Sequence, residues 1–112
     1  MLNDFDKRIV SLLIVECDHL IEVCDKNNDY EIRSSFILSD AIQYEFEKLF
    51  EDISRLSKEI QEDPTLHINE LRGIRNRIAH NYETVSISIL IDTVKKDIPS
   101  LKGILKNYLE ID

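Results

Sequence analysis

Glycine, proline and long apolar runs are scarce in this sequence. Two glycines and two prolines in 112 residues leave little material for the tight turns that connect strands. Charged residues make up 32% and hydrophobic residues 43% of the chain, which is typical of a folded domain and not of a disordered one. A chain of this length builds one hydrophobic core. We therefore expect a single all-α domain over residues 1–112, an antiparallel bundle of four to five helices.

No stretch of about 18 apolar residues occurs, so we expect no membrane span. The N-terminal sequence MLNDFDKRIVSLLIVECDHL lacks the basic start and the small-residue cleavage site of a signal peptide, which favours a cytoplasmic protein. Cys17 and Cys24 would lie about 10 Å apart along one helix, too far for a disulfide. We interpret them as small core residues. Two thiols without suitably spaced partners predict no zinc site, and nothing in the sequence predicts a cofactor.

Apolar side chains recur at helical spacing along most of the first half of the chain. Capping and turn residues divide this half into three parts. The expected parts are a helix from Asn3 or Asp4 to about Cys24, a polar loop over residues 25–31, and the longest helix, from Ser34 or Ser39 to about Gln61.

Proline and small polar residues set the expected boundaries in the second half. Pro64 ends the long helix because it disfavours helical angles at the residue before it. A third helix follows and continues through Gly73, since one glycine costs only about 1 kcal/mol. Thr84 or Ser86 can cap a fourth helix. Pro99 fits the first turn of a fifth, unless it only kinks the fourth.

The segment LRGIRNRIAHNYE, residues 71–83, gathers positive charge in a chain whose formal net charge is -8. Three arginines and one histidine, with no acid among them, occur between Arg72 and Tyr82. An acidic protein generally repels nucleic acid, because phosphate contacts need lysine and arginine. The segment therefore predicts one small, locally basic site and not a broad nucleic-acid coat.

Helical geometry places the polar residues of this segment in two pairs. Each residue advances about 100°, so Arg75 and Tyr82 lie about 20° apart, and Asn76 and His80 about 40° apart. Arg75 and His80 are about 140° apart around the axis and about 7.5 Å apart along it. One helix cannot easily direct both side chains at one atom. Two copies of the helix across a two-fold axis would bring two arginines and two histidines together.

Arginine and histidine together suit the transesterification of RNA. A base takes the proton from a ribose 2′-OH, that oxygen attacks the adjacent phosphorus, a cation stabilises the phosphoryl oxygens, and an acid protonates the leaving 5′-oxygen. Arginine supplies a permanent forked charge, and histidine exchanges a proton near neutral pH. This route needs no metal ion. The alternative from the residues alone is that the arginines form solvated ion pairs and that His80 is an ordinary surface or interface histidine.

The pattern R-N-x-x-x-H-x-Y at residues 75–82 resembles the R-x4-H-x-Y signature of HEPN domains, specifically the HepT-like branch of MNT/HEPN toxin–antitoxin pairs. Residues 39–60 resemble the second helix of that branch, with Glu51 where the family carries a glutamate. Residues 94–105 resemble part of its C-terminal half. One departure is Ile68, where many relatives have tryptophan.

The resemblance implies a homodimeric HEPN fold whose paired motifs form a metal-independent cleft for RNA cleavage. Arg75 would bind and stabilise the scissile phosphate, and His80 would act as general base or acid. Asn76 would orient the histidine or the phosphate. In the family, a cognate MNT-type nucleotidyltransferase antitoxin transfers AMP onto the motif tyrosine, which is Tyr82 here. The adenylate would place negative charge near Arg75 and exclude RNA.

Three further residues could support this site. Arg72 and Arg77 could guide RNA to the cleft or form surface ion pairs. Glu51 could be an exposed helix acid or could pair with a motif arginine and hold its fork. Competing functions are a non-catalytic HEPN partner or nucleotide-binding subunit of a nucleotidyltransferase, and a structural dimerisation domain. Replacing His80 with alanine separates these functions, because only the ribonuclease would lose RNA cleavage.

Overall fold

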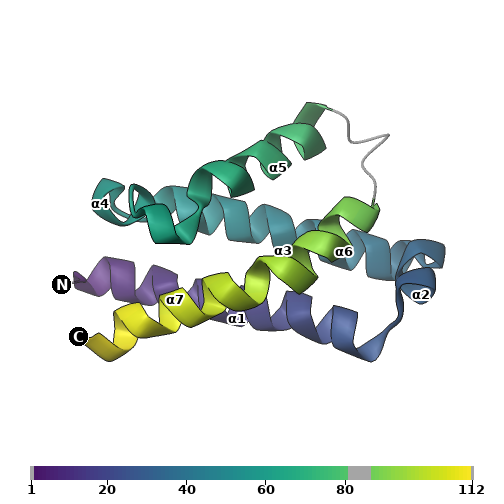
Figure 1. The fold of residues 1–112 in the computed structure, drawn as a ribbon, viewed down its shortest axis with the longest axis horizontal. Coiled ribbons are helices and arrows are strands. Elements are labelled where there is room, and N and C mark those ends of the chain that lie inside the picture. Colours follow the sequence, from purple (N-terminus) through teal and green to yellow (C-terminus); the bar gives the residue numbers. More distant parts are fainter. Residues whose placement is uncertain (1, 81–86, 112) are drawn as a thin grey trace.

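The fold of the described residues is all-α, as predicted. The structure, a computed structural model, describes the backbone of residues 2–80 and 87–111 and the side chains of residues 2–76 and 87–110. Over these residues it contains seven α-helices, one short 3-10 helix and no strand (Figure 1). They are α1 (Asp4–Lys26), α2 (Asp29–Ser34), α3 (Phe36–Arg55), α4 (Lys58–Gln61), η1 (Pro64–Leu66), α5 (Ile68–His80), α6 (Ile87–Lys96) and α7 (Ile98–Ile111).

The first helix begins where the sequence predicted. The Asn3 side chain accepts a hydrogen bond from the Asp6 amide at 2.7 Å, which satisfies one of the free N–H groups of the first turn. Asp4 and Asp6 add the negative charge that a helix N-terminus favours. The helix ends at Lys26, two residues beyond the expected end at Cys24.

The prediction of a loop over residues 25–31 is wrong, because α2 begins inside this range. The Asn28 side chain accepts from the Glu31 amide at 2.8 Å, and the Glu31 carboxylate accepts from the Asn28 amide at 3.0 Å. This reciprocal pair is a capping box, which starts a helix. The polar residues that suggested a loop are therefore the cap of α2.

The prediction of the long second helix is correct in position but wrong at both ends. Its N-cap is Ser35, which accepts from the Leu38 amide at 3.2 Å, between the two expected start sites. Ser39 lies inside α3 and donates to the Ile32 carbonyl oxygen at 2.8 Å. The helix ends at Arg55 and does not continue to Gln61, which belongs to α4. The amide of Ser57 at this break donates to Asp6 Oδ1 of α1 at 3.0 Å.

The helices pack as an up-and-down bundle around α1. Figure 1 shows α3 and α7 running beside α1 in the opposite direction, and these two helix pairs form the largest contacts. Among the described side chains, 23 hydrophobic residues are buried in the core. Phe46, Leu13 and Leu105 are among those that are fully buried. Cys17 is buried and Cys24 half-buried, and both are free thiols, as predicted.

The last two helices follow each other with only Asp97 between them. The Asp97 amide donates to Thr93 in α6, and its carbonyl oxygen accepts from Leu101 in α7. Pro99 lies in the first turn of α7, which confirms the five-helix alternative at this point. The expected caps Thr84 and Ser86 lie outside the described residues. Among the described helices, none is both long and apolar enough to cross a membrane.

Candidate functional site

A short capped turn sets the start of α5, the helix of the cationic segment. Asp63 Oδ1 accepts from the Thr65 amide at 2.9 Å and so caps η1, with Pro64 as its first residue. His67 ends η1 in the left-handed region, at φ 53° and ψ 38°, where the chain turns into α5. The Tyr108 hydroxyl of α7 donates to Asp63 Oδ2. Thus α7 fixes the turn that positions α5.

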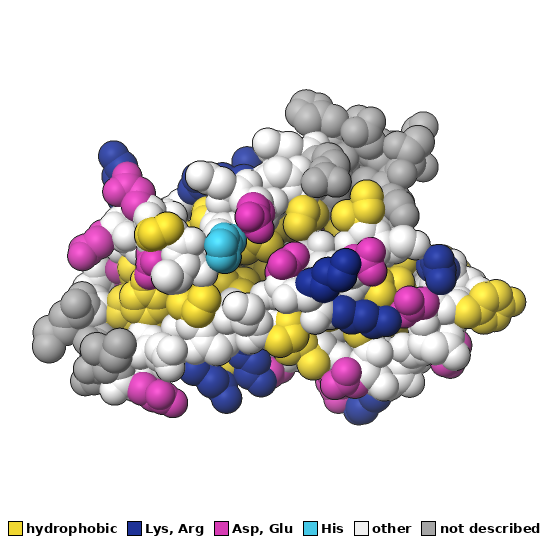
Figure 2. Space-filling model, viewed as in Figure 1, with side chains coloured by type: hydrophobic (Ala, Val, Ile, Leu, Met, Phe, Trp, Pro, Cys, Tyr) yellow, Lys and Arg dark blue, Asp and Glu magenta, His cyan; other side chains and the backbone are white. Residues whose placement is uncertain are grey.

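The apolar side of α5 faces the bundle and leaves Arg72 and Arg75 outside. Ile68, Leu71 and Ile74 are 4%, 4% and 8% exposed. Arg72 and Arg75 are exposed and border a narrow crevice between α3 and α5. On the other side of α5, Figure 2 shows hydrophobic side chains along the hollow toward α6 and α7, with acidic and basic groups mixed around it. That face presents no surface of a single charge sign.

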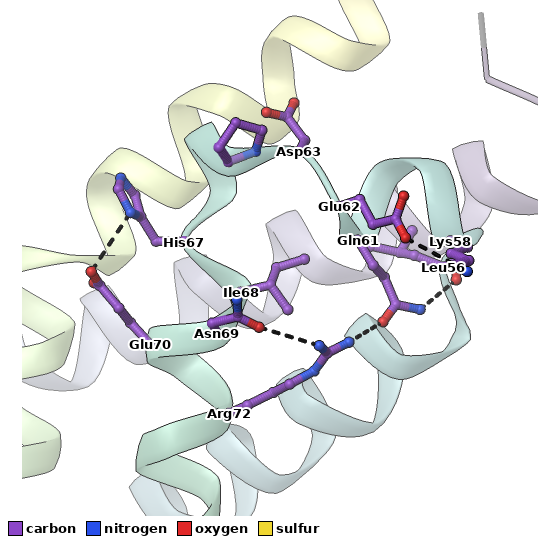
Figure 3. Close-up of a pocket in the computed structure, with 11 residues that line it drawn as sticks. Leu56, Lys58, Gln61, Glu62, Asp63, His67, Ile68, Asn69, Glu70 and Arg72 are labelled. Carbon is purple, nitrogen blue, oxygen red and sulfur yellow. Dashed lines mark hydrogen bonds and ion pairs between the residues drawn. The ribbon is translucent and has the colours of Figure 1, made fainter.

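Neutral amides hold both described arginines of the segment. Arg72 donates through Nη2 to Gln61 Oε1 at 2.5 Å and through Nη1 to Asn69 Oδ1 at 3.4 Å (Figure 3). Arg75 Nη2 makes a long hydrogen bond to Asn76 Oδ1, at 3.5 Å. Among the described side chains, neither arginine contacts a carboxylate. An amide orients a guanidinium without cancelling its charge, so both cations remain available to an anion.

Several other cations of the chain pair with carboxylates, although Arg33 donates to a carbonyl and a hydroxyl oxygen. Arg55 lies 3.0 Å from Asp52, and Lys95 lies 2.7 Å from Asp29. These carboxylates offset the cationic charge locally. The contrast matters because the sequence has 22 acids against 14 lysines and arginines. Carboxylates are abundant, yet the described partners of Arg72 and Arg75 are all amides.

The structure describes only some of the predicted site residues. Asn76 and His80 lie on the same helix as Arg75, and Asn76 contacts the Arg75 guanidinium. Glu51 is exposed on α3 and is bonded to neither Arg72 nor Arg75, so its pairing with a motif arginine stays a prediction. The side chains of Arg77 and His80 and the whole of Tyr82 lie outside what the structure describes.

Sequence reasoning missed two residues, Gln61 and Asn69, that hold Arg72 in place. Asn69 precedes Arg72 by one helical turn, and this spacing on a predicted helix was an available signal. Gln61 comes from α4, on the far side of the turn before α5. No helical spacing connects Gln61 with Arg72, so only the folded chain shows the contact.

Sequence comparison relates the chain to proteins named as ribonucleases. A family model described as "Ribonuclease HepT-like" matches residues 13–108. A protein of Thermococcus cleftensis named "Probable ribonuclease HepT" is 33% identical over 95 residues, which cover 80% of this chain and 84% of the relative. A protein of Caldanaerobacter subterraneus named "Putative RNase" is 27% identical over 99 residues, 88% of each chain. No solved structure gives a significant match. The matched residues include all of α3 and α5, and the chain belongs to the HepT-like ribonuclease family, within the HEPN superfamily.

Proposed function

We propose that this protein is an endoribonuclease that cleaves RNA where the α5 helices of two copies meet. One observation carries the proposal. The Arg75 guanidinium is exposed, has only an amide as its described partner, and lies on the helix that also carries His80. An exposed arginine without a carboxylate partner suits a phosphodiester. The family relationship supports the same chemistry, since its described activity is that of a ribonuclease.

A homodimer accounts for the geometry of the motif. Arg75 and His80 are five residues apart on one helix, which separates them by about 140° around the axis and about 7.5 Å along it. Two copies related by a two-fold axis bring the arginine of one α5 and the histidine of the other to one phosphate. The dimer is therefore part of the catalytic proposal.

In the proposed reaction, His80 of one copy removes the proton from the ribose 2′-OH. The 2′-oxygen forms a bond to phosphorus, and the bond from phosphorus to the 5′-oxygen breaks. His80 of the second copy returns a proton to the 5′-oxygen, which leaves a cyclic phosphate and a 5′-hydroxyl. Arg75 stabilises the charge on the phosphoryl oxygens. Asn76 holds the Arg75 guanidinium through its oxygen and can donate its amide hydrogens to the phosphate.

Regulation is proposed to act on Tyr82. A nucleotidyltransferase antitoxin of the MNT type would transfer AMP to its hydroxyl, with the ribonuclease as the toxin of the pair. Tyr82 follows Arg75 by seven residues, about 20° around a continued helix. The phosphate of the adenylate would bind the motif arginine and occupy the space of the RNA phosphate.

Cleavage of labelled RNA in the presence of a metal chelator tests the catalytic proposal. We expect the wild-type protein to cleave, and the His80→Ala and Arg75→Gln variants to lose activity while they keep the wild-type mass in solution. Lys26→Gln, which removes an exposed positive charge at the far end of α1, is the matched control and should cleave normally. A wild-type protein that cleaves no RNA under any metal condition would instead indicate a non-catalytic partner of a nucleotidyltransferase.

Co-expression with a neighbouring nucleotidyltransferase gene tests the regulatory proposal. Intact-mass and peptide analysis should show adenylate on the Tyr82 peptide, and the modified protein should not cleave RNA. Tyr82→Phe should remain unmodified and active. An unmodified Tyr82 in a neutralised complex would contradict the AMP-transfer route.

A further inference from the structure

An open pocket of about 770 Å³ lies where the chain turns from α4 through η1 into α5. Figure 3 shows Arg72 extending across it from α5 toward Gln61, with Lys58 and Glu62 near that end and His67 and Glu70 near the other. Leu56, Asp63, Pro64, Ile68 and Asn69 complete its lining. The pocket adjoins the crevice that Arg75 borders, since Arg72 lines both.

The Arg72 guanidinium is fixed in the pocket by an anchored amide. Gln61 Nε2 donates to the carbonyl oxygens of Leu56, at 2.6 Å, and Ser54, at 3.3 Å. These bonds use free carbonyls at the end of α3 and turn Gln61 Oε1 toward Arg72. Arg72 donates two of its five N–H groups to Gln61 and Asn69, so three N–H groups remain for a ligand.

The acids of the pocket have partners other than Arg72. Glu62 lies 3.7 Å from Lys58, and Glu70 lies 3.7 Å from His67. Asp63 accepts hydrogen bonds from Thr65 and Tyr108. The positive charge of Arg72 is thus concentrated on one wall. The rest of the pocket holds three carboxylates and one lysine, together with His67, amides and apolar groups, so it disfavours a second phosphate and suits a base and a ribose better.

Arg72 and Arg75 lie about one helical turn apart, so they can bind neighbouring phosphates of one strand. The residues are three apart on α5, which is about 4.5 Å along the axis and about 60° around it. Both border the crevice with Phe50, Ile53 and Ser54. A strand whose phosphate binds Arg75 can therefore place the next phosphate at Arg72.

We propose that Arg72 and this pocket bind the nucleotide next to the scissile phosphate, with its phosphate on Arg72 and its base and ribose in the pocket. Gln61 is a positioning residue, because it directs the guanidinium and leaves its charge intact. This inference rests on the proposed ribonuclease function and adds a binding subsite to it. The subsite would select RNA that continues beyond the cleaved bond.

Binding of short 2′-O-methyl oligouridines tests the subsite without cleavage. A dinucleotide places its one phosphate at Arg75 and has none for Arg72, whereas a trinucleotide has a second phosphate that reaches Arg72. Titration of the dimeric wild-type protein should show tighter binding of the trinucleotide. Arg72→Gln should weaken binding of the trinucleotide about tenfold and reduce the slope of its salt dependence by about one. Binding of the dinucleotide should stay unchanged.

Gln61→Glu tests the anchored, uncompensated guanidinium as a whole, because it also removes the Nε2 donors to Leu56 and Ser54. The glutamate has the same length but adds a carboxylate beside Arg72, so it should weaken the trinucleotide although Arg72 is present. Arg72→Lys keeps the positive charge but loses the forked guanidinium group. Its affinity for the trinucleotide should lie between those of wild type and Arg72→Gln. Lys26→Gln should bind both oligonucleotides as the wild type does. Thermal unfolding of each variant checks that it is folded.

Equal binding of the trinucleotide by wild type, Arg72→Gln and Gln61→Glu would overturn the subsite. A similar loss for both oligonucleotides would also overturn it, because Arg72 would then act only through general electrostatics. A wild-type protein that does not favour the trinucleotide excludes the subsite as well. Length-dependent binding through Arg72 in a protein that cleaves no RNA would support the subsite and refute the proposed catalysis.

Discussion

The Tyr108 hydroxyl donates a hydrogen bond to the Asp63 carboxylate across 45 residues of sequence, joining the last helix to the turn before α5. This bond, followed by those from Thr65, holds the pKa of Asp63 below its usual value of 3.8. Burial, followed by the same bond, raises the pKa of Tyr108 to about 12. The two residues therefore link the orientation of the cationic helix to the packing of α7.

Tyr108→Phe should destabilise the protein by about 1 kcal/mol at neutral pH. This is below the range for hydrogen bonds to charged groups, because Asp63 is partly exposed and screened by solvent. The folded-state pKa of Asp63 lies below 3.8, so its stabilising contribution is present above that pH and is lost as the pH falls through the folded value. Chemical denaturation should show a difference between variant and wild type that shrinks in strong acid. Tyr44→Phe, which alters a 60% exposed tyrosine, is the control.

Glu16→Gln should stabilise the protein at neutral pH. Glu16 is only 4% exposed, and neither oxygen of its ionised carboxylate accepts a hydrogen bond from a described residue. Burial, followed by a hydrogen bond and repulsion involving Asp52, raises its pKa to about 8, while Lys48 lowers it and Glu45 raises it further. A proton on Glu16 can be donated to Asp52, so the folded state favours the protonated acid.

The size of this effect depends on pH. The folded pKa of Glu16 exceeds its ordinary value of 4.5, so its cost to stability is absent below 4.5 and grows as the pH rises toward about 8. Glutamine removes the cost, and we expect a gain on the order of 2 kcal/mol at neutral pH and no gain in acid. Denaturation across this pH range measures it. Glu22→Gln, at an exposed pair with Lys26, is the control and should leave the stability nearly unchanged.

Gly73→Ala should stabilise α5 by about 0.5 to 1 kcal/mol. A Cβ atom at this position would meet no atom within 4 Å, so alanine fits without a clash. Alanine also has a higher helix propensity and reduces the conformational freedom of the unfolded chain. Gly103 in α7 is equally open, and Gly103→Ala serves as a matched substitution away from the site. The shift in melting temperature measures both effects. Destabilisation by Gly73→Ala alone would indicate that another chain approaches α5 closely.

Asn76→Asp should reduce RNA cleavage more than Asn76→Ala. The aspartate keeps the shape of asparagine but places a carboxylate where the amide oxygen now lies, 3.5 Å from Arg75 Nη2. Its charge would oppose the stabilisation of the phosphoryl oxygens, and loss of one such stabilising group costs about 10² to 10³ in rate. Single-turnover cleavage provides the measurement. Equal rates for Asn76→Asp and wild type would show that the neutrality of this partner is unimportant.

Local sequence signals predicted the parts of the fold that depend on neighbouring residues. Asn3 and the apolar spacing of α1 fixed its beginning, and Pro99 fixed the first turn of α7. The end of α3 was mispredicted because it depends on Asp6, which accepts from the Ser57 amide across 51 residues. No local pattern contains such a contact.

The candidate site also has a part that the sequence predicted and a part that it did not. The sequence placed Arg75, Asn76 and His80 on one helix, because their spacing is a property of that helix. It could not show that Gln61 anchors Arg72, since this bond needs the turn between α4 and α5. The homodimer and the role of Tyr82 stay predictions, because they depend on a second chain and on residues outside those described.

The amide partners of Arg72 and Arg75 have a practical consequence for the choice of buffer. Dissolved oxyanions such as phosphate and sulfate can occupy positions that no carboxylate of the described chain fills. By mass action such ions would raise the melting temperature and compete with polynucleotides. Affinities measured in chloride and in phosphate at equal ionic strength should therefore differ, and sulfate-grown crystals would be expected to trap the ion beside α5.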